Sequence, residues 1–252
     1  HGAVDDSMLR IKENMDVWRT VVQWSDDKLA EKIREDQIDI LIDMSGNTAG
    51  DRLKVFARHP APVQITWIGY PGTTGIKAMD YILMENTVLP GKNINAQFTE
   101  KIIRIPRSYA FDVEEQLPDV TEAPCVNNNF ITFGSFNRLN KINREVIALW
   151  CEVLRKLPDS RLQMAGMPSD GAPDELLTWF KEEEISEDRL YFYPRSGFVE
   201  YLKLHNQVDF CLDTFPYTGG TTTMHALWMG VPTLTLIGDT YPSAQEIGRA
   251  HV

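Results

Sequence analysis

The chain has few of the features that mark several large classes of protein. Its 252 residues include three cysteines, Cys125, Cys151 and Cys211, which lie far apart and without CxxC spacing. This scarcity argues against a disulfide framework and a zinc site, and it indicates free thiols in a reducing compartment. Cys151 and Cys211 have apolar neighbours and are expected in the core. Because no apolar run is long enough for a membrane span or a signal segment, we expect a cytoplasmic protein that binds no membrane.

Basic residues are also scarce relative to acidic ones. The chain has 25 Lys and Arg against 36 Asp and Glu, a net charge of −11 at pH 7. This balance argues against a nucleic-acid partner, although it leaves room for a local basic pocket. A GxxxxGK[ST] motif is missing, which disfavours P-loop phosphoryl transfer, and a missing GxGxxG after the early strands disfavours a dehydrogenase. No Asp-X-Asp triplet occurs, so we expect neither a metal ion nor another cofactor at a nucleotide site.

Short β-branched runs alternate with amphipathic segments, which predicts an α/β fold with parallel sheets. In residues 1–111, strands are expected at 38–44, 63–68, 79–84 and 101–105, and helices at 26–34 and 52–58. Residues 112–129, rich in Glu, Pro and Asn, are predicted to form a linker. In residues 130–252, strands are expected at 130–136, 161–165, 190–193, 208–212 and 233–237, and helices at 142–157, 175–184, 198–206 and before Gly230. Two such Rossmann-like halves would face each other across a cleft.

The most informative stretch runs from Asp209 to Gly230. A buried strand leads into Gly219 and Gly220, and the three hydroxyls of Thr221, Thr222 and Thr223 open a helix. Glycines let backbone approach a ligand, and the free N–H groups and positive dipole end of a helix favour an anion. The pattern therefore suggests a phosphate or diphosphate site. An ordinary strand-to-helix connection with threonine caps is the alternative.

A second loop, Asn137–Lys141, also follows a predicted strand and opens a helix. In a parallel sheet both loops face the same edge, so Lys141 could meet a diphosphate and the charge that develops as it leaves. The alternative is a solvated loop lysine. His225 follows the threonines and could reach a ligand or simply pack on its helix.

Three ordered motifs resemble one family. They are Pro60 to Gly75 (PAPVQITWIGYPGTTG), Phe136 to Ile142 (FNRLNKI), and Asp213 to Pro232 (DTFPYTGGTTTMHALWMGVP). Together they resemble the catalytic region of the O-linked N-acetylglucosamine transferase family, the SPINDLY-like GT-B group, in its bacterial branch. The likeness extends from about residue 38 to residue 239.

The resemblance implies a GT-B glycosyltransferase with two Rossmann-like lobes, both incomplete in this chain. It implies inverting, metal-independent transfer from a UDP-sugar, usually UDP-N-acetylglucosamine, to Ser or Thr of protein acceptors, with tetratricopeptide repeats in the full-length parent. Lys141 matches the family's catalytic lysine at the diphosphate. The positions implied for nucleotide-sugar binding are Asn137, Arg138, Lys141, Tyr201, Gly219, Gly220, Thr221, Thr222, Thr223 and His225. Those implied for the loop facing sugar and acceptor are Tyr70, Pro71, Gly72, Thr73, Thr74 and Gly75.

Some positions depart from the family pattern. Gly220 stands where histidine is common, His225 where an acidic residue is common, and Arg138 where an amide is common. These differences keep other readings open: GDP-fucose or UDP-glucose as donor, asparagine as acceptor, or a nucleotide-sugar-binding module without turnover. The family's N-terminal catalytic segment does not precede His1, so we expect this fragment alone to be inactive. Residues Glu246–Val252 resemble a translated sequencing adaptor and are expected to be non-native.

Overall fold

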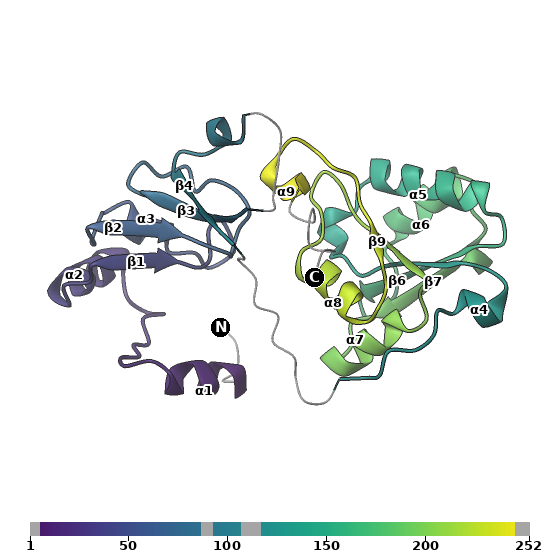
Figure 1. The fold of residues 1–252 in the computed structure, drawn as a ribbon, viewed down its shortest axis with the longest axis horizontal. Helices are drawn as coiled ribbons and strands as arrows, with labels where there is room; N and C mark the ends of the chain where they lie inside the picture. The colour runs from purple at the N-terminus through teal and green to yellow at the C-terminus, as the bar shows by residue number, and fades with distance from the viewer. Residues whose placement is uncertain (1–5, 87–92, 107–116, 245–252) are drawn as a thin grey trace.

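The computed structural model describes residues 6–86, 93–106 and 117–244. Within these ranges the strands form two separate sheets, one of four strands and one of five, and neighbouring strands pair in parallel (Figure 1). Parallel strands need crossover connections, and both sheets use helices or long loops for them. The α/β architecture with parallel sheets is therefore confirmed.

The N-terminal sheet follows the chain order. Its strands are β1 (Ile40–Asp43), β2 (Val63–Thr66), β3 (Tyr81–Glu85) and β4 (Lys101–Ile105), each close to a predicted strand. The accompanying helices are α1 (Asp6–Glu13), α2 (Asp26–Glu35), α3 (Leu53–Phe56) and the 3₁₀ turn η1 (Ile94–Gln97). The helices expected at 26–34 and 52–58 are thus present, the second as a single turn.

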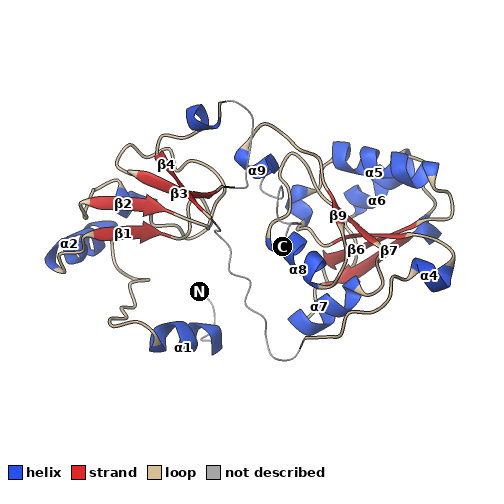
Figure 2. Ribbon diagram, in the orientation of Figure 1, coloured by secondary structure: helices blue, strands red, loops and turns tan. Residues whose placement is uncertain are grey.

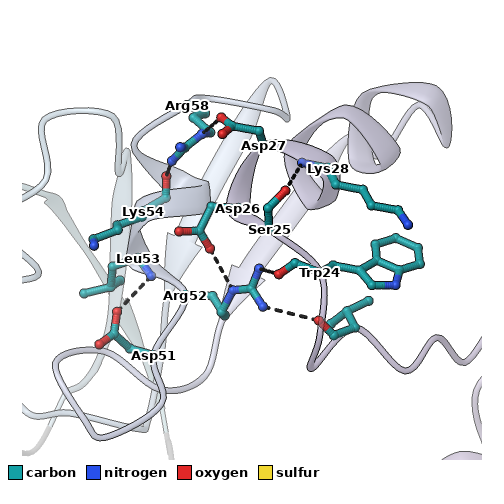
Figure 3. Close-up of polar contacts among 11 residues, drawn as sticks. Trp24, Ser25, Asp26, Asp27, Lys28, Asp51, Arg52, Leu53, Lys54 and Arg58 are labelled. Atoms are coloured by element: carbon teal, nitrogen blue, oxygen red, sulfur yellow. Dashed lines mark hydrogen bonds and ion pairs between the residues drawn. The ribbon is translucent and has the colours of Figure 1, made fainter.

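Two arginines next to α3 form hydrogen bonds and ion pairs that hold α2 beside it (Figure 3). Arg52 donates to the Asp26 carboxylate at 2.9 Å and to the Trp24 carbonyl at 3.0 Å, and Arg58 pairs with Asp27 at 2.6 Å. The Ser25 hydroxyl accepts from the Lys28 N–H and caps α2. These contacts fix the helices that precede and follow β1, and with them the loop at its carboxyl end.

The C-terminal sheet has the strand order β7-β6-β5-β8-β9. The strands are β5 (Thr132–Ser135), β6 (Arg161–Met167), β7 (Leu190–Pro194), β8 (Phe210–Leu212) and β9 (Thr233–Leu234). The chain winds outward from β5 in one direction, then returns to place β8 on the other side of β5. This reversal is the topological switch point of a doubly wound sheet, where ligands characteristically bind.

Helices cover both faces of the C-terminal sheet (Figure 2). On one side lie α5 (Arg144–Lys156) and α6 (Asp174–Glu182), and on the other α7 (Phe198–His205) and α8 (Thr221–Trp228). Each side has its own apolar cluster, the first containing Cys151 and the second Cys211. Both thiols are buried, as predicted, and burial raises the pKa of each to about 12.

The helix α5 illustrates how the sequence sets these elements. Its apolar stripe buries Val146, Trp150 and Leu154 against the sheet, and Asn143 caps it by accepting from the Val146 N–H at 2.9 Å. The helix begins two residues later than expected, because the preceding residues form the 3₁₀ turn η2 (Leu139–Lys141). That turn matters below, since it carries Lys141.

A few elements differ from expectation. The short helix α4 (Cys125–Asn128) and the turn η3 (Glu187–Arg189) were not anticipated, nor was α1. The strand expected at 233–237 is only two residues long. The N- and C-terminal boundaries of the two lobes and the linker stay predictions, and residues 246–252 lie outside the described chain.

The last described element, α9 (Tyr241–Ala244), connects the two sheets. Tyr241 packs with Met84 of β3 and meets the Phe98 ring edge-on, with ring centroids 6.3 Å apart. The Gln97 amide donates to the Asp239 carbonyl at 2.8 Å. Within the described ranges, no helix is both long and apolar enough to cross a membrane.

Candidate active site

The candidate site lies at the carboxyl edge of the C-terminal sheet, where β5 and β8 are neighbours. Residues 137–141, here the Lys141 loop, follow β5, and residues 213–220, here the glycine loop, follow β8. The Asn137 amide donates to the Asp213 carboxylate at 3.1 Å, and the Lys141 ammonium donates to the Thr218 carbonyl at 2.7 Å. The two loops thus lie side by side at the switch point, as a parallel sheet predicts.

Asp213 organises this edge. The carboxylate is 5% exposed, and its Oδ1 accepts from the backbone N–H groups of Thr214 and Gly219, both at 2.8 Å. The same oxygen accepts from the Asn137 amide at 3.1 Å, while Oδ2 accepts from the Thr235 hydroxyl at 2.8 Å. Burial raises the pKa of Asp213 more than these hydrogen bonds lower it. One side chain therefore ties together both loops and the end of β9.

Lys141 stands beside the glycine loop. Its Nζ donates to the Thr218 carbonyl at 2.7 Å and lies 4.5 Å from the centroid of the Tyr217 ring. These contacts hold a cation within two residues of Gly220, where α8 begins. Arg138, the other base of the Lys141 loop, is exposed. The solvated-lysine alternative does not fit this half-buried, hydrogen-bonded ammonium.

The three threonines open α8 as expected, but they play different parts. Thr221 is exposed at the first position, Thr222 donates to the Asn137 amide oxygen at 3.1 Å, and Thr223 is buried. A Cβ on Gly219 would come within 2.5 Å of the Thr223 hydroxyl, whereas one on Gly220 would meet open space. The reason for glycine at 219 is therefore the packing of the loop's own hydroxyls. At Gly220, in contrast, a Cβ would meet no atom within 4 Å, so the backbone there is open to an approaching ligand.

Tyr201 and His225 form a second group of predicted residues, on α7 and α8. The His225 Nδ1 lies 3.2 Å from the Tyr201 hydroxyl, and the His225 ring meets the Phe198 ring edge-on at 5.2 Å. Burial lowers the pKa of His225 and raises that of Tyr201. Burial therefore favours the neutral form of the His225 imidazole, which is held by aromatic packing as well as by its hydrogen bond.

The N-terminal sheet presents the loop Tyr70–Gly75, here the threonine loop, beyond the carboxyl end of β2. The loops after β1 and β2 pass very close: a Cβ on Gly69 would lie 2.2 Å from the Met44 carbonyl oxygen. Asp43, 5% exposed, accepts from the Gly46 N–H at 2.9 Å and from the Thr66 hydroxyl at 2.8 Å. The loops at this edge are therefore also held by close backbone packing and by hydrogen bonds to a buried aspartate.

Sequence reasoning missed three buried carboxylates that hold loops, Asp43, Asp213 and Glu100. Glu100 precedes β4 and accepts from the Thr73 hydroxyl and the Thr74 N–H, each at 2.7 Å. For Asp213 a signal was available, because an aspartate directly after a buried strand and before Thr and Gly is typical of a loop anchor. Glu100 gave no such signal, since it lies 26 residues from its partner Thr74. Within the described residues, no group of three or more His, Cys, Asp or Glu side chains could hold a metal ion.

Comparison with known proteins identifies relatives along nearly the whole chain. The family model for glycosyl transferase family 41 matches residues 10–129 and 121–247. A barley (Hordeum vulgare) protein named probable UDP-N-acetylglucosamine–peptide N-acetylglucosaminyltransferase SPINDLY is 36% identical over 252 residues, covering 97% of this chain and 26% of its own. The Arabidopsis thaliana protein of the same type named SEC is 31% identical, covering 90% of this chain and 24% of its own.

Solved structures agree. A variant of the Thermobaculum terrenum O-GlcNAc transferase is 35% identical and superposes with a TM-score of 0.85, over 99% of this chain and 46% of the solved one. A Rickettsia africae glycosyltransferase, 14% identical with a TM-score of 0.51, shares the fold alone. The fold is therefore the GT-B form of α/β architecture. The chain spans about a quarter of the length of the curated relatives.

Proposed function

Because the chain belongs to glycosyl transferase family 41, we propose that it forms part of an enzyme that transfers a sugar from a UDP-sugar to protein. The proposed donor is UDP-N-acetylglucosamine and the acceptor a peptide, as the names of the relatives say of those proteins, and we propose Ser and Thr hydroxyls as the accepting groups. The observation that carries the proposal is the meeting of Lys141 with the glycine loop at the switch point.

The diphosphate is proposed to lie against the start of α8. The helix N-terminus offers N–H groups and its dipole, Thr221 an exposed hydroxyl, and Gly220 an unobstructed approach. The Lys141 ammonium, already beside Thr218, supplies the positive charge. As the acceptor oxygen bonds to the anomeric carbon it releases its proton to a base or to water, the bond from that carbon to the phosphate oxygen breaks, and UDP leaves with the electron pair. Lys141 stabilises the charge that grows on the departing diphosphate.

The remaining residues are proposed to orient the donor and acceptor. Asn137 and Asp213 hold the two phosphate-facing loops together, and Tyr201 and His225 provide the side facing the nucleoside. The threonine loop faces the sugar and the acceptor from the other lobe. An in-line displacement by an acceptor arriving from that side would invert the anomeric carbon. With Lys141 supplying the charge, no metal ion is proposed.

The test is a transfer assay on the full-length protein with a peptide acceptor, in the presence of EDTA. UDP-N-acetylglucosamine, UDP-glucose and GDP-fucose are compared as donors, and NMR of the glycopeptide gives the anomeric configuration. Lys141→Ala should lower kcat by about 100-fold or more, the effect of removing one charge-stabilising group. Lys156→Ala, which removes an exposed lysine at the end of α5, is the matched control and should leave kcat unchanged.

Each result has a clear reading. Transfer from GDP-fucose or UDP-glucose instead would replace the proposed donor while keeping the site. Loss of all transfer in EDTA, restored by Mg²⁺, would refute metal independence. Equal activity of the two lysine variants would refute the role of Lys141.

A further inference from the structure

We propose that Glu100 is a positioning residue that fixes the threonine loop for the acceptor side of the reaction. This inference rests on the proposed function, because it assigns a task to that loop. Glu100 lies directly before β4 and is 5% exposed, while the loop it holds follows β2. The contact therefore joins two crossover connections that are far apart in sequence.

The carboxylate holds two successive residues through both backbone and side chains. Its Oε2 accepts from the Thr73 hydroxyl at 2.7 Å, and its Oε1 accepts from the Thr74 N–H at 2.7 Å and also from the Thr74 hydroxyl. An ionised carboxylate only accepts, so the Thr73 and Thr74 hydroxyls act as donors in these bonds, and the Thr99 hydroxyl also donates to Oε2 at 3.2 Å. The loop conformation and the orientation of both hydroxyls are thus set by one side chain.

The threonine oxygens are also used as acceptors within the protein. The Thr73 hydroxyl oxygen lies 3.0 Å from the Gly75 N–H and 3.2 Å from the Thr99 N–H, and the Thr74 oxygen lies 3.3 Å from the Ile76 N–H. Both hydroxyls therefore serve to shape the loop. We infer that Thr73 and Thr74 act on a substrate indirectly, by presenting the rest of the loop in a fixed conformation.

Glu100 lies close to the place where the two lobes touch. Two residues before it, Phe98 packs against Tyr241 of α9. The next residue, Pro242, accepts through its carbonyl from the Thr218 hydroxyl at 2.8 Å, and the Thr218 carbonyl accepts from Lys141. These contacts join the two lobes, but the Glu100 carboxylate itself bonds to Thr73 and Thr74 of its own lobe, so its effect is expected on the acceptor side.

The carboxylate is ionised where the enzyme would work. Burial alone raises the pKa of Glu100, but the hydrogen bonds from Thr74 and Thr73 together lower it further, so the pKa lies below its ordinary value. Replacing one acceptor oxygen with an NH₂ group, as in Glu100→Gln, removes the charge and turns one acceptor into a donor. Because glutamine has the same shape as glutamate, this substitution tests the hydrogen bonds to Thr73 and Thr74 without creating a cavity.

The experiment compares Glu100→Gln with Asp80→Asn in the full-length protein. Asp80 also precedes a strand of the same sheet, β3, and its carboxylate also accepts a backbone N–H, but the donor is Gln64 at 2.8 Å and not a residue of the threonine loop. In Glu100→Gln, kcat/KM for the acceptor peptide should fall by about tenfold or more, the effect of misplacing a positioning group. The Kd for UDP should stay within about twofold of wild type, because the nucleotide lies on the other lobe.

Two further measurements separate positioning from general weakening of the fold. Thr74→Val should lower kcat/KM for the acceptor peptide as Glu100→Gln does, whereas Thr74→Ser, which keeps the hydroxyl, should retain it. The double variant Thr74→Val with Glu100→Gln should lower kcat/KM little more than either single substitution. Hydrogen exchange of the Thr74 amide should accelerate in Glu100→Gln and not in Asp80→Asn. Acceptor kinetics and Thr74 exchange that match those of Asp80→Asn would overturn the inference. Absence of transfer by the wild-type protein would overturn the proposed function and this inference with it.

Discussion

The two lobes hold the loops at the carboxyl edges of their sheets in the same way, but those loops carry different groups. In each lobe a buried aspartate ends a parallel strand, accepts N–H groups from the following loop and accepts a threonine hydroxyl from beside the adjacent strand. Asp43 does so with Gly46 and Thr66, and Asp213 with Gly219 and Thr235. Such an anchor satisfies the backbone donors of a tight loop and fixes its conformation.

The two loops differ in the charged groups beside them. The glycine loop leads into the N-terminus of α8 and has the Lys141 ammonium at its side, whereas the threonine loop contains no lysine or arginine. A nucleotide diphosphate needs positive potential, and an uncharged acceptor hydroxyl does not. The difference supports the proposal that the nucleotide binds the C-terminal lobe and the acceptor the N-terminal lobe, and the following predictions test that division.

The largest effect is expected from removing the anchors themselves. Asp43→Ala and Asp213→Ala should each lower the free energy of unfolding by about 3 kcal/mol or more, because several buried donors lose their acceptor at about 1–3 kcal/mol each. Only Asp213→Ala should also weaken UDP binding, by about tenfold or more. Urea denaturation and calorimetric titration measure the two quantities, with Asp213→Asn as a milder variant. If Asp43→Ala weakened UDP binding as much as Asp213→Ala does, the proposal that the nucleotide binds the C-terminal lobe would be contradicted.

The next effect concerns acid stability, which we expect to be governed by His205 in the C-terminal lobe. Its ring is fully buried and stacks on Phe136 with centroids 3.7 Å apart, and burial lowers its pKa from 6.5 to about 4. Because the unfolded chain takes up the proton below pH 6.5 and the folded chain only near pH 4, stability should fall as the pH decreases through this window. The expected loss is about 3 kcal/mol at about 1.4 kcal/mol per pKa unit.

His205→Phe is the variant that isolates this effect. Phenylalanine keeps the stacking on Phe136 but cannot be protonated, so the fall in stability between pH 6.5 and about 4 should become shallower. Chemical denaturation at a series of pH values measures the slope. An unchanged slope would place the acid sensitivity elsewhere, for example on His225.

A third effect compares a glycine from each edge. A Cβ at Gly69 would strike the Met44 backbone, while one at Gly219 would strike the Thr223 side chain, which can rotate. Gly69→Ala should therefore cost about 2–3 kcal/mol of stability and Gly219→Ala about 1 kcal/mol. Gly219→Ala alone should weaken UDP binding. Gly197→Ala, where a Cβ meets nothing within 4 Å, is the control and should cost less than about 1 kcal/mol.

The smallest effect concerns how the free energy of unfolding depends on pH. Two buried carboxylates, Glu100 and Asp213, should contribute to this dependence with opposite signs. The pKa of Glu100 is lowered, so its stabilisation is present at neutral pH and lost as the pH falls through that pKa. The pKa of Asp213 is raised, so the folded protein gains stability as the pH falls through it. The stability gap between wild type and Glu100→Gln should therefore narrow on acidification, while the gap for Asp213→Asn should widen. Thermal unfolding measured from pH 7 to well below 4.5, the ordinary pKa of glutamate, would show whether the two stability gaps change in opposite directions; a change in the same direction would contradict the comparison.

Much of the fold could be predicted because its signals are local. The apolar stripe, Asn143 cap and basic end of α5, and the β-branched runs of the strands, are written in neighbouring residues. The proximity of the Lys141 and glycine loops also followed, because parallel strands bring their carboxyl ends to one edge.

The anchors were harder to predict because their partners are distant in sequence. Glu100 meets Thr74 across 26 residues and Asp213 meets Asn137 across 76. Periodicity cannot report such pairings, and neither can composition. The contact of α9 with Phe98 likewise depends on how the chain returns to the first sheet.

The central claim is tested most directly by calorimetric titration of UDP into the full-length protein in EDTA, with Lys141→Ala and Lys156→Ala in parallel. The account predicts that wild type and Lys156→Ala bind UDP with the same affinity without metal, and that Lys141→Ala binds at least about tenfold more weakly, as expected when a charged partner of the diphosphate is lost. Binding unaffected by Lys141→Ala would contradict the placement of the diphosphate beside the glycine loop.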